Sequence, residues 1–140
     1  MKYESLTIYT DGGSRGNPGS AAYGFVVTSE HGSKIYEEGK VIGITTNNVA
    51  EYSAVAAALK YVLETLNDKP STINFFMDSK LVCEQMSGNW KIKNENLRSL
   101  YYTIKDYDQK LGAKVTYRHV RREENTEADL MVNLALDGLI

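Results

Sequence analysis

The hydrophobic pattern changes period between residues 44 and 50, and this change limits the folds open to the chain. Before it, apolar and polar residues alternate or run together in three short segments, 6–11, 21–28 and 34–44, separated by glycine-containing turns. After it, Val55, Ala58, Leu59, Val62 and Leu66 form a stripe with helical spacing. The pattern therefore predicts three strands in an antiparallel meander, followed by a helix over residues 50–66.

The second half of the chain alternates between the two kinds of pattern. We expect strands over 72–77 and 114–120 and helices over 79–86, 95–111 and 126–136. A strand–helix–strand crossover normally joins parallel neighbours, so the last two strands should lie parallel in the sheet. The predicted fold class is α/β: a five-stranded mixed sheet of three antiparallel and two parallel strands, flanked by helices. The 140 residues suit a single domain, residues 1–140.

Charge and cysteine content restrict the function and the compartment. The net charge is −2 and the isoelectric point about 5.7, whereas a nucleic-acid-binding domain is usually basic. Any contact with phosphate must therefore rely on local basic clusters or on bound cations. The single cysteine, Cys83, excludes an internal disulfide and favours a reducing compartment. Without a signal-like or membrane-spanning segment, we expect a cytoplasmic protein with no membrane partner and no obligatory protein partner.

Four carboxylates occupy the ends of predicted elements. Asp11 ends the first strand at a Gly-Gly turn, and Asp78 directly follows the fourth strand. Glu51 and Asp129 fall in the predicted first turns of helices, on their apolar faces. Each has an ordinary structural explanation: Asp11 as a turn residue, Asp78 as a helix N-cap, and the other two as members of capping boxes.

The four acids together suggest a different explanation. Strand ends and helix starts can meet at one edge of a sheet, where inward-pointing carboxylates repel one another. Such a group is costly to bury unless a cation neutralises it, and hard oxygen ligands suit Mg²⁺ or Mn²⁺. From the residues alone, the acids form a candidate metal site.

The sequences around these acids resemble those of a known family. Residues 9–19 (YTDGGSRGNPG), 45–51 (TTNNVAE), 77–79 (MDS) and 122–129 (REENTEAD) are similar, in order and spacing, to the signature segments of type 1 ribonuclease H. The resemblance covers essentially the whole chain. It implies the ribonuclease H-like fold, whose order of strands and helices matches the one predicted above.

The resemblance also implies an activity and a cofactor. It predicts an endonuclease that hydrolyses the RNA strand of RNA–DNA hybrids and leaves 5′-phosphate and 3′-hydroxyl ends. The catalytic and metal-binding residues would be Asp11, Glu51, Asp78 and Asp129, with two Mg²⁺ or Mn²⁺ ions bound in the presence of substrate. Two alternatives remain open: a catalytically weak module that only binds nucleic acid, and a nuclease with a broader substrate such as double-stranded RNA.

Substrate contacts are expected from short polar and basic side chains. The family resemblance places minor-groove and backbone contacts at Asn17, Thr46, Asn47 and Asn48, although these are also typical turn and cap residues. Lys80 and Arg122 are candidate phosphate ligands.

The sequence departs from the family pattern at two places. Many members carry a loop histidine before the last acid, but His119 falls in a predicted strand, so we expect at most an accessory role; Arg121 and Arg122 are the alternatives. Residues 87–94 leave little room for the basic protrusion of some members, which predicts weaker, salt-sensitive binding.

Overall fold

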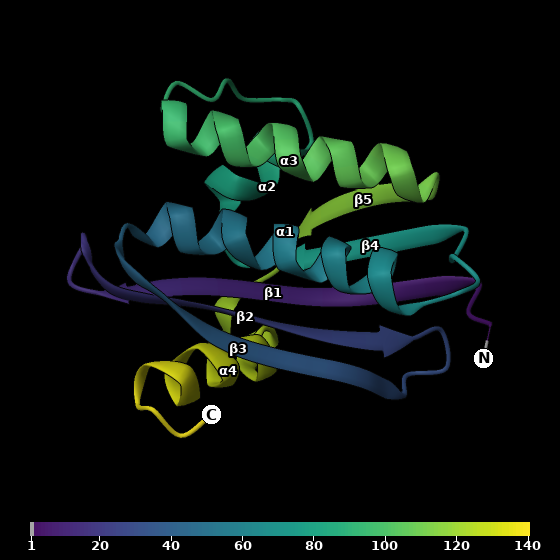
Figure 1. The fold of residues 1–140 in the computed structure, drawn as a ribbon, viewed down its shortest axis with the longest axis horizontal. Coiled ribbons are helices and arrows are strands. Elements are labelled where there is room, and N and C mark those ends of the chain that lie inside the picture. The colour runs from purple at the N-terminus through teal and green to yellow at the C-terminus, as the bar shows by residue number, and fades with distance from the viewer. Residues whose placement is uncertain (1) are drawn as a thin grey trace.

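The computed structural model describes residues 2–140, and its centre is one mixed five-stranded sheet (Figure 1). Strands β1 (Ser5–Arg15), β2 (Gly19–Ser29) and β3 (Lys34–Thr45) form an antiparallel meander, while β4 (Thr72–Met77) and β5 (Lys114–His119) extend it in parallel from β1. The order across the sheet is β3-β2-β1-β4-β5. The predicted arrangement of three antiparallel and two parallel strands is confirmed.

The helices lie on both faces of the sheet. They are α1 (Asn47–Thr65), α2 (Lys80–Met86), α3 (Glu95–Leu111) and α4 (Thr126–Leu136), with a short 3₁₀ turn, η1 (Arg122–Glu124), before α4. Figure 1 shows α1 and α3 on one side of the sheet and α4 on the other. The main apolar core lies between the sheet and α1, whereas Ala22, Val132 and Ala135 form a small separate cluster under α4. Within residues 2–140, no helix has both the length and the apolar character that crossing a bilayer requires.

The first strand is longer than predicted. The expected turn at Gly12-Gly13 is wrong, because β1 continues through both glycines, which pair with Tyr23 and Ala22 of β2. A Cβ atom on Gly12 would lie 2.3 Å from the carbonyl carbon of Ala50 in α1. Glycine is therefore required here by the close approach of α1 to β1 and not by a change of chain direction.

The extension of β1 changes the position of the first acid. The pairing of β4 with β1 ends at Thr10 opposite Met77. Asp11 therefore lies within β1, one residue beyond the point where β4 stops, and not at the end of its strand. The end of β4 leaves space beside β1 at this level, and the Asp11 carboxyl group lies next to it.

Candidate metal centre and groove

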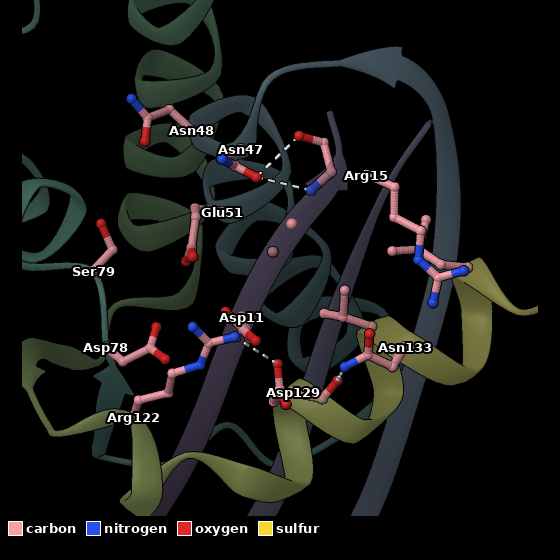
Figure 2. Close-up of a pocket in the computed structure, with 15 residues that line it drawn as sticks. Asp11, Arg15, Asn47, Asn48, Glu51, Asp78, Ser79, Arg122, Asp129 and Asn133 are labelled. Carbon is pink, nitrogen blue, oxygen red and sulfur yellow. Dashed lines mark hydrogen bonds and ion pairs between the residues drawn. The ribbon is translucent and has the colours of Figure 1, made fainter. Parts of the chain in front are cut away.

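Three acids from three separate elements meet where β4 ends. Oxygen atoms of Asp11 in β1, Glu51 in α1 and Asp78, the residue after β4, all lie within 4.8 Å of one another (Figure 2). Asp11 and Glu51 are each only 7% exposed. The close packing of α1 against Gly12 brings Glu51 to this position, since a larger residue in β1 would hold the helix away.

The structure removes the simpler explanations for these acids. Thr46 is the N-cap of α1 and its Oγ1 accepts a hydrogen bond from the backbone N–H of Val49 (3.3 Å), so Glu51 lies in the second turn and belongs to no capping box. The N-cap of α2 is Ser79, not Asp78. Because Asp11 lies within a strand, it is not a turn residue either. None of the three carboxylates is needed to cap a helix or close a turn.

The acids interact unfavourably when all are charged. Burial, followed by the charge of Asp78, raises the pKa of Asp11 to about 7. Burial and then the charge of Asp11 raise the pKa of Glu51 well above its ordinary value. Burial also raises the pKa of Asp78. The Oε2 atom of Glu51 is buried and has no hydrogen-bond partner within residues 2–140, so part of this cluster has no compensating interaction from the chain.

The fourth predicted acid, Asp129, comes from α4 and lies beside Asp11 (Figure 2). Helix α4 packs on glycines of β2 and β3: a Cβ atom would lie 2.6 Å from the Ala128 carbonyl oxygen at Gly24 and 2.3 Å from that of Met131 at Gly39. This close packing brings Asp129 into the same groove as the other acids. Its carboxylate is not within the 4.8 Å group and lies 3.9 Å from the guanidinium of Arg122.

The four acids face a groove of about 480 Å³ between the N-terminal part of α1 and α4. Of the predicted substrate-binding residues, Asn47, Asn48 and Arg122 line it (Figure 2). Asn47 Oδ1 accepts hydrogen bonds from the backbone N–H (2.8 Å) and the hydroxyl (3.0 Å) of Ser14. The Asn47 N–H in turn donates to Asn17 Oδ1 (3.0 Å). Thus Asn17 and Asn47 tie the β1–β2 turn to α1, and Thr46 caps that helix.

The remaining predicted residues lie outside the groove lining. Lys80 begins α2 and is exposed. His119 is the last residue of β5, as its sequence predicted, and its Nε2 lies 3.2 Å from the carbonyl oxygen of Asp78. Arg121 is exposed and pairs with Glu124 (3.3 Å). Of these three residues, His119 is therefore the one that contacts an acid of the cluster.

Several groove residues were not predicted from the sequence: Ser79, Arg15, Val132, Asn133 and Leu136. The signal for Arg15 was present in the alternation of β1. In a strand that continues to residue 15, the side chains of Asp11 and Arg15 project from the same face, with Gly13 between them. In α4, Val132 and Leu136 share the helix face of Asp129, but only the tertiary packing brings that face over β1.

Comparison with known proteins gives a consistent result. The family profile for RNase H matches residues 3–136. A bifunctional protein of Mycobacterium tuberculosis is 42% identical over 134 residues, which cover 95% of this chain and 36% of that protein. Ribonuclease HI of Halobacterium salinarum is 38% identical over 92% of this chain and 63% of its own length. The chain thus spans about a third of the length of the first of these relatives and less than two thirds of the second.

A solved structure extends the similarity to three dimensions. An RNase H1 determined in complex with an RNA/DNA hybrid superimposes with a TM-score of 0.88 at 39% identity, covering 95% of this chain and 97% of that one. The family match spans nearly all of the chain, and the solved relative shares both its fold and more than a third of its residues. The chain therefore belongs to the ribonuclease H family, in its type 1 branch.

Proposed function

We propose that this chain is an endonuclease that hydrolyses the RNA strand of RNA–DNA hybrids in the presence of divalent metal ions. The observation that carries the proposal is the group of three carboxylates from β1, α1 and the end of β4, which caps no helix and closes no turn. Membership of the ribonuclease H family and similarity to an RNase H1 solved with an RNA/DNA hybrid support the reaction and the substrate.

The donor set fits a hard divalent cation. Asp11, Glu51 and Asp78 offer only carboxylate oxygens, which Mg²⁺ and Mn²⁺ prefer. The buried Glu51 Oε2, without a partner among residues 2–140, is the kind of atom that a cation would satisfy. Asp129 of α4, which lines the same groove beside Asp11, is the fourth proposed ligand. Two bound ions would activate a water molecule and neutralise charge on the phosphate and on the leaving 3′ oxygen.

The chain's own residues orient the nucleic acid. Arg122 offers a guanidinium at the acidic end of the groove, where a phosphate of the RNA strand would lie. Asn47 and Asn48 lie at the N-terminal end of α1 and line the groove, where we propose that they would meet the minor groove of a bound hybrid. Short amides there suit recognition of 2′-hydroxyl groups and of duplex shape.

The protonation state of Asp11 should depend on cation binding. A raised pKa means that Asp11 is partly protonated near pH 7 when no cation is bound. Cation binding favours the charged form of the carboxylates, because a positive charge nearby lowers their pKa. The two serine hydroxyls of the groove lining have structural partners: Ser14 donates to Asn47, and Ser79 accepts from the Val82 N–H as the N-cap of α2. We therefore propose direct hydrolysis by water, with a 5′-phosphate and a 3′-hydroxyl as products.

The experiment is a cleavage assay with a labelled RNA–DNA hybrid, with and without Mg²⁺ or Mn²⁺. Double-stranded RNA, double-stranded DNA and single-stranded RNA are assayed in parallel, and Asp78→Asn serves as the contamination control. We expect metal-dependent cutting of the hybrid's RNA strand, absent in the variant. Binding of the hybrid without cutting would indicate a nucleic-acid-binding module and refute the proposed enzyme activity. Equal cutting of double-stranded RNA would refute the substrate assignment.

A further inference from the structure

The groove extends well beyond the acids, along β1 toward its end. Arg15 lies four positions after Asp11, which corresponds to roughly 13 Å of strand. Both side chains project from the same face of β1, and Gly13 between them carries no side chain. Figure 2 shows Arg122 beside the acids and Arg15 at the other end of the groove. The groove therefore has a second arginine, away from the cluster.

Within residues 2–140, Arg15 forms one ion pair, and it is weak. Its Nη2 lies 2.6 Å from Oδ1 of Asp137, the residue that caps the C-terminus of α4. The two side chains are 50% and 47% exposed. Ion pairs this open to solvent contribute little to stability because water and salt screen them. A phosphate that can form two parallel hydrogen bonds with a guanidinium is a stronger partner than this carboxylate.

The base of Arg15 is held rigidly. Its neighbour Ser14 is bound through both its N–H and its hydroxyl to Asn47, and Arg15 itself pairs with Ser20 of β2. The position from which the side chain projects is therefore fixed relative to the acidic cluster, while the exposed guanidinium is free to change partner. This combination suits a residue that recognises a charged group at a set distance from the reacting one.

We propose that Arg15 binds a phosphate of the RNA strand, further along the groove than the scissile phosphate, and that Asp137 holds the guanidinium in place until the strand arrives. The assignment rests on the proposed function, and it adds a positioning residue to it. Since a guanidinium recognises phosphate regardless of base, Arg15 sets where along the strand the acids act and adds no sequence preference.

The test separates phosphate binding from a merely structural role. Arg15→Ala should raise KM for the hybrid about fivefold, the loss of one charge-assisted contact, with kcat changed less than twofold. Arg15→Lys should recover part of this loss. Asp137→Asn should lower KM, because it removes the competing carboxylate. If the ion pair only fastens α4 to β1, Asp137→Asn raises KM as Arg15→Ala does, and the inference is wrong.

Salt dependence provides a second readout. In a cleavage-deficient Asp78→Asn background, binding of a fluorescein-labelled hybrid is measured over a range of KCl concentrations. Arg15→Ala should make the slope of log K (the association constant) against log salt concentration shallower by about one unit, which corresponds to the loss of one phosphate contact. Lys60→Ala, which removes an exposed cation in the C-terminal half of α1, should leave the slope unchanged; an unchanged slope for Arg15→Ala would overturn the inference. A wild type that neither binds nor cuts the hybrid would instead refute the proposed function itself.

Discussion

Strands β1 and β4 form an apolar part of the sheet, and an acidic end lies where β4 stops, at Asp11 within β1 and Asp78 directly after β4. The two parts have opposite effects on the molecule. Leu6 and Ile8 of β1 and Phe75 of β4 are completely buried against the main core. A few residues further on, Asp11 and Asp78 face one another with raised pKa values. The apolar part stabilises the fold, while the acidic end costs stability and retains the capacity to bind a cation. Such a cost is typical of functional sites.

The largest expected effect comes from the acidic end. Asp11→Asn preserves the shape of the side chain and removes one charge, so hybrid cleavage should fall at least about 1000-fold while the fold persists. Cleavage rate and circular dichroism are measured on the same preparation. Cleavage by this variant at the wild-type rate would show that Asp11 is not part of the catalytic centre.

The apolar part should respond in the opposite way. Phe75→Ala removes a fully buried ring that stacks on Tyr117 at 5.2 Å between ring centres, and it should lower the free energy of unfolding by about 4 kcal/mol. Urea denaturation measures this loss. At a temperature where the variant is folded, its cleavage rate should remain within a few fold of wild type; a loss comparable to that of Asp11→Asn would mean that the two parts are not separable.

The cost of the acidic end should depend on pH when metal is removed. Asp11 has a pKa of 3.8 when unperturbed and about 7 in the fold, so between these values the folded state binds more protons than the unfolded state. The contribution of Asp11 to the free energy of unfolding is therefore largest below about pH 4 and is lost as the pH rises through 7. In EDTA, raising the pH from 5 to 8 should destabilise wild type by about 2 kcal/mol more than Asp11→Asn. Equal pH dependence of the two proteins in urea denaturation would contradict this account.

The smallest effect is expected from a residue beside the cluster. His119 contacts Asp78 only through the backbone carbonyl oxygen, at 3.2 Å, and it lies outside the groove lining. His119→Ala should therefore reduce kcat by less than about tenfold, within the range of a single lost hydrogen bond. Steady-state kinetics on the hybrid provide the value. A thousandfold loss would place His119 among the catalytic residues.

The sequence predicted the fold well because local patterns determine most of it. Alternation and helical spacing identified the nine main strands and helices in their order, and the crossover rule predicted which strands are parallel. The error at Gly12-Gly13 arose because glycine has two uses: it permits turns, and it permits close packing. Only the position of α1, a tertiary feature, shows that the second applies here.

The candidate site was predictable only in part, for the same reason. The acids could be selected because they stood at predicted element boundaries and matched family segments. Their alternative explanations as caps could be removed only when Thr46 and Ser79 were seen to cap the helices. Arg15 was missed because β1 was expected to end at Asp11. The α4 wall of the groove was missed because nothing local indicates that the C-terminal half of α4 lies over β1.

The central claim, that the acidic end is a divalent metal site, is tested most directly by calorimetric titration of Mn²⁺ and of Mg²⁺ into the free protein. Asp11→Asn is the test variant. Asp106→Asn, which changes an exposed acid of α3 paired with Lys110, is the matched control. We predict saturable binding to wild type and to Asp106→Asn, and binding weakened at least about tenfold in Asp11→Asn. Equal affinity of Asp11→Asn and wild type would contradict the claim.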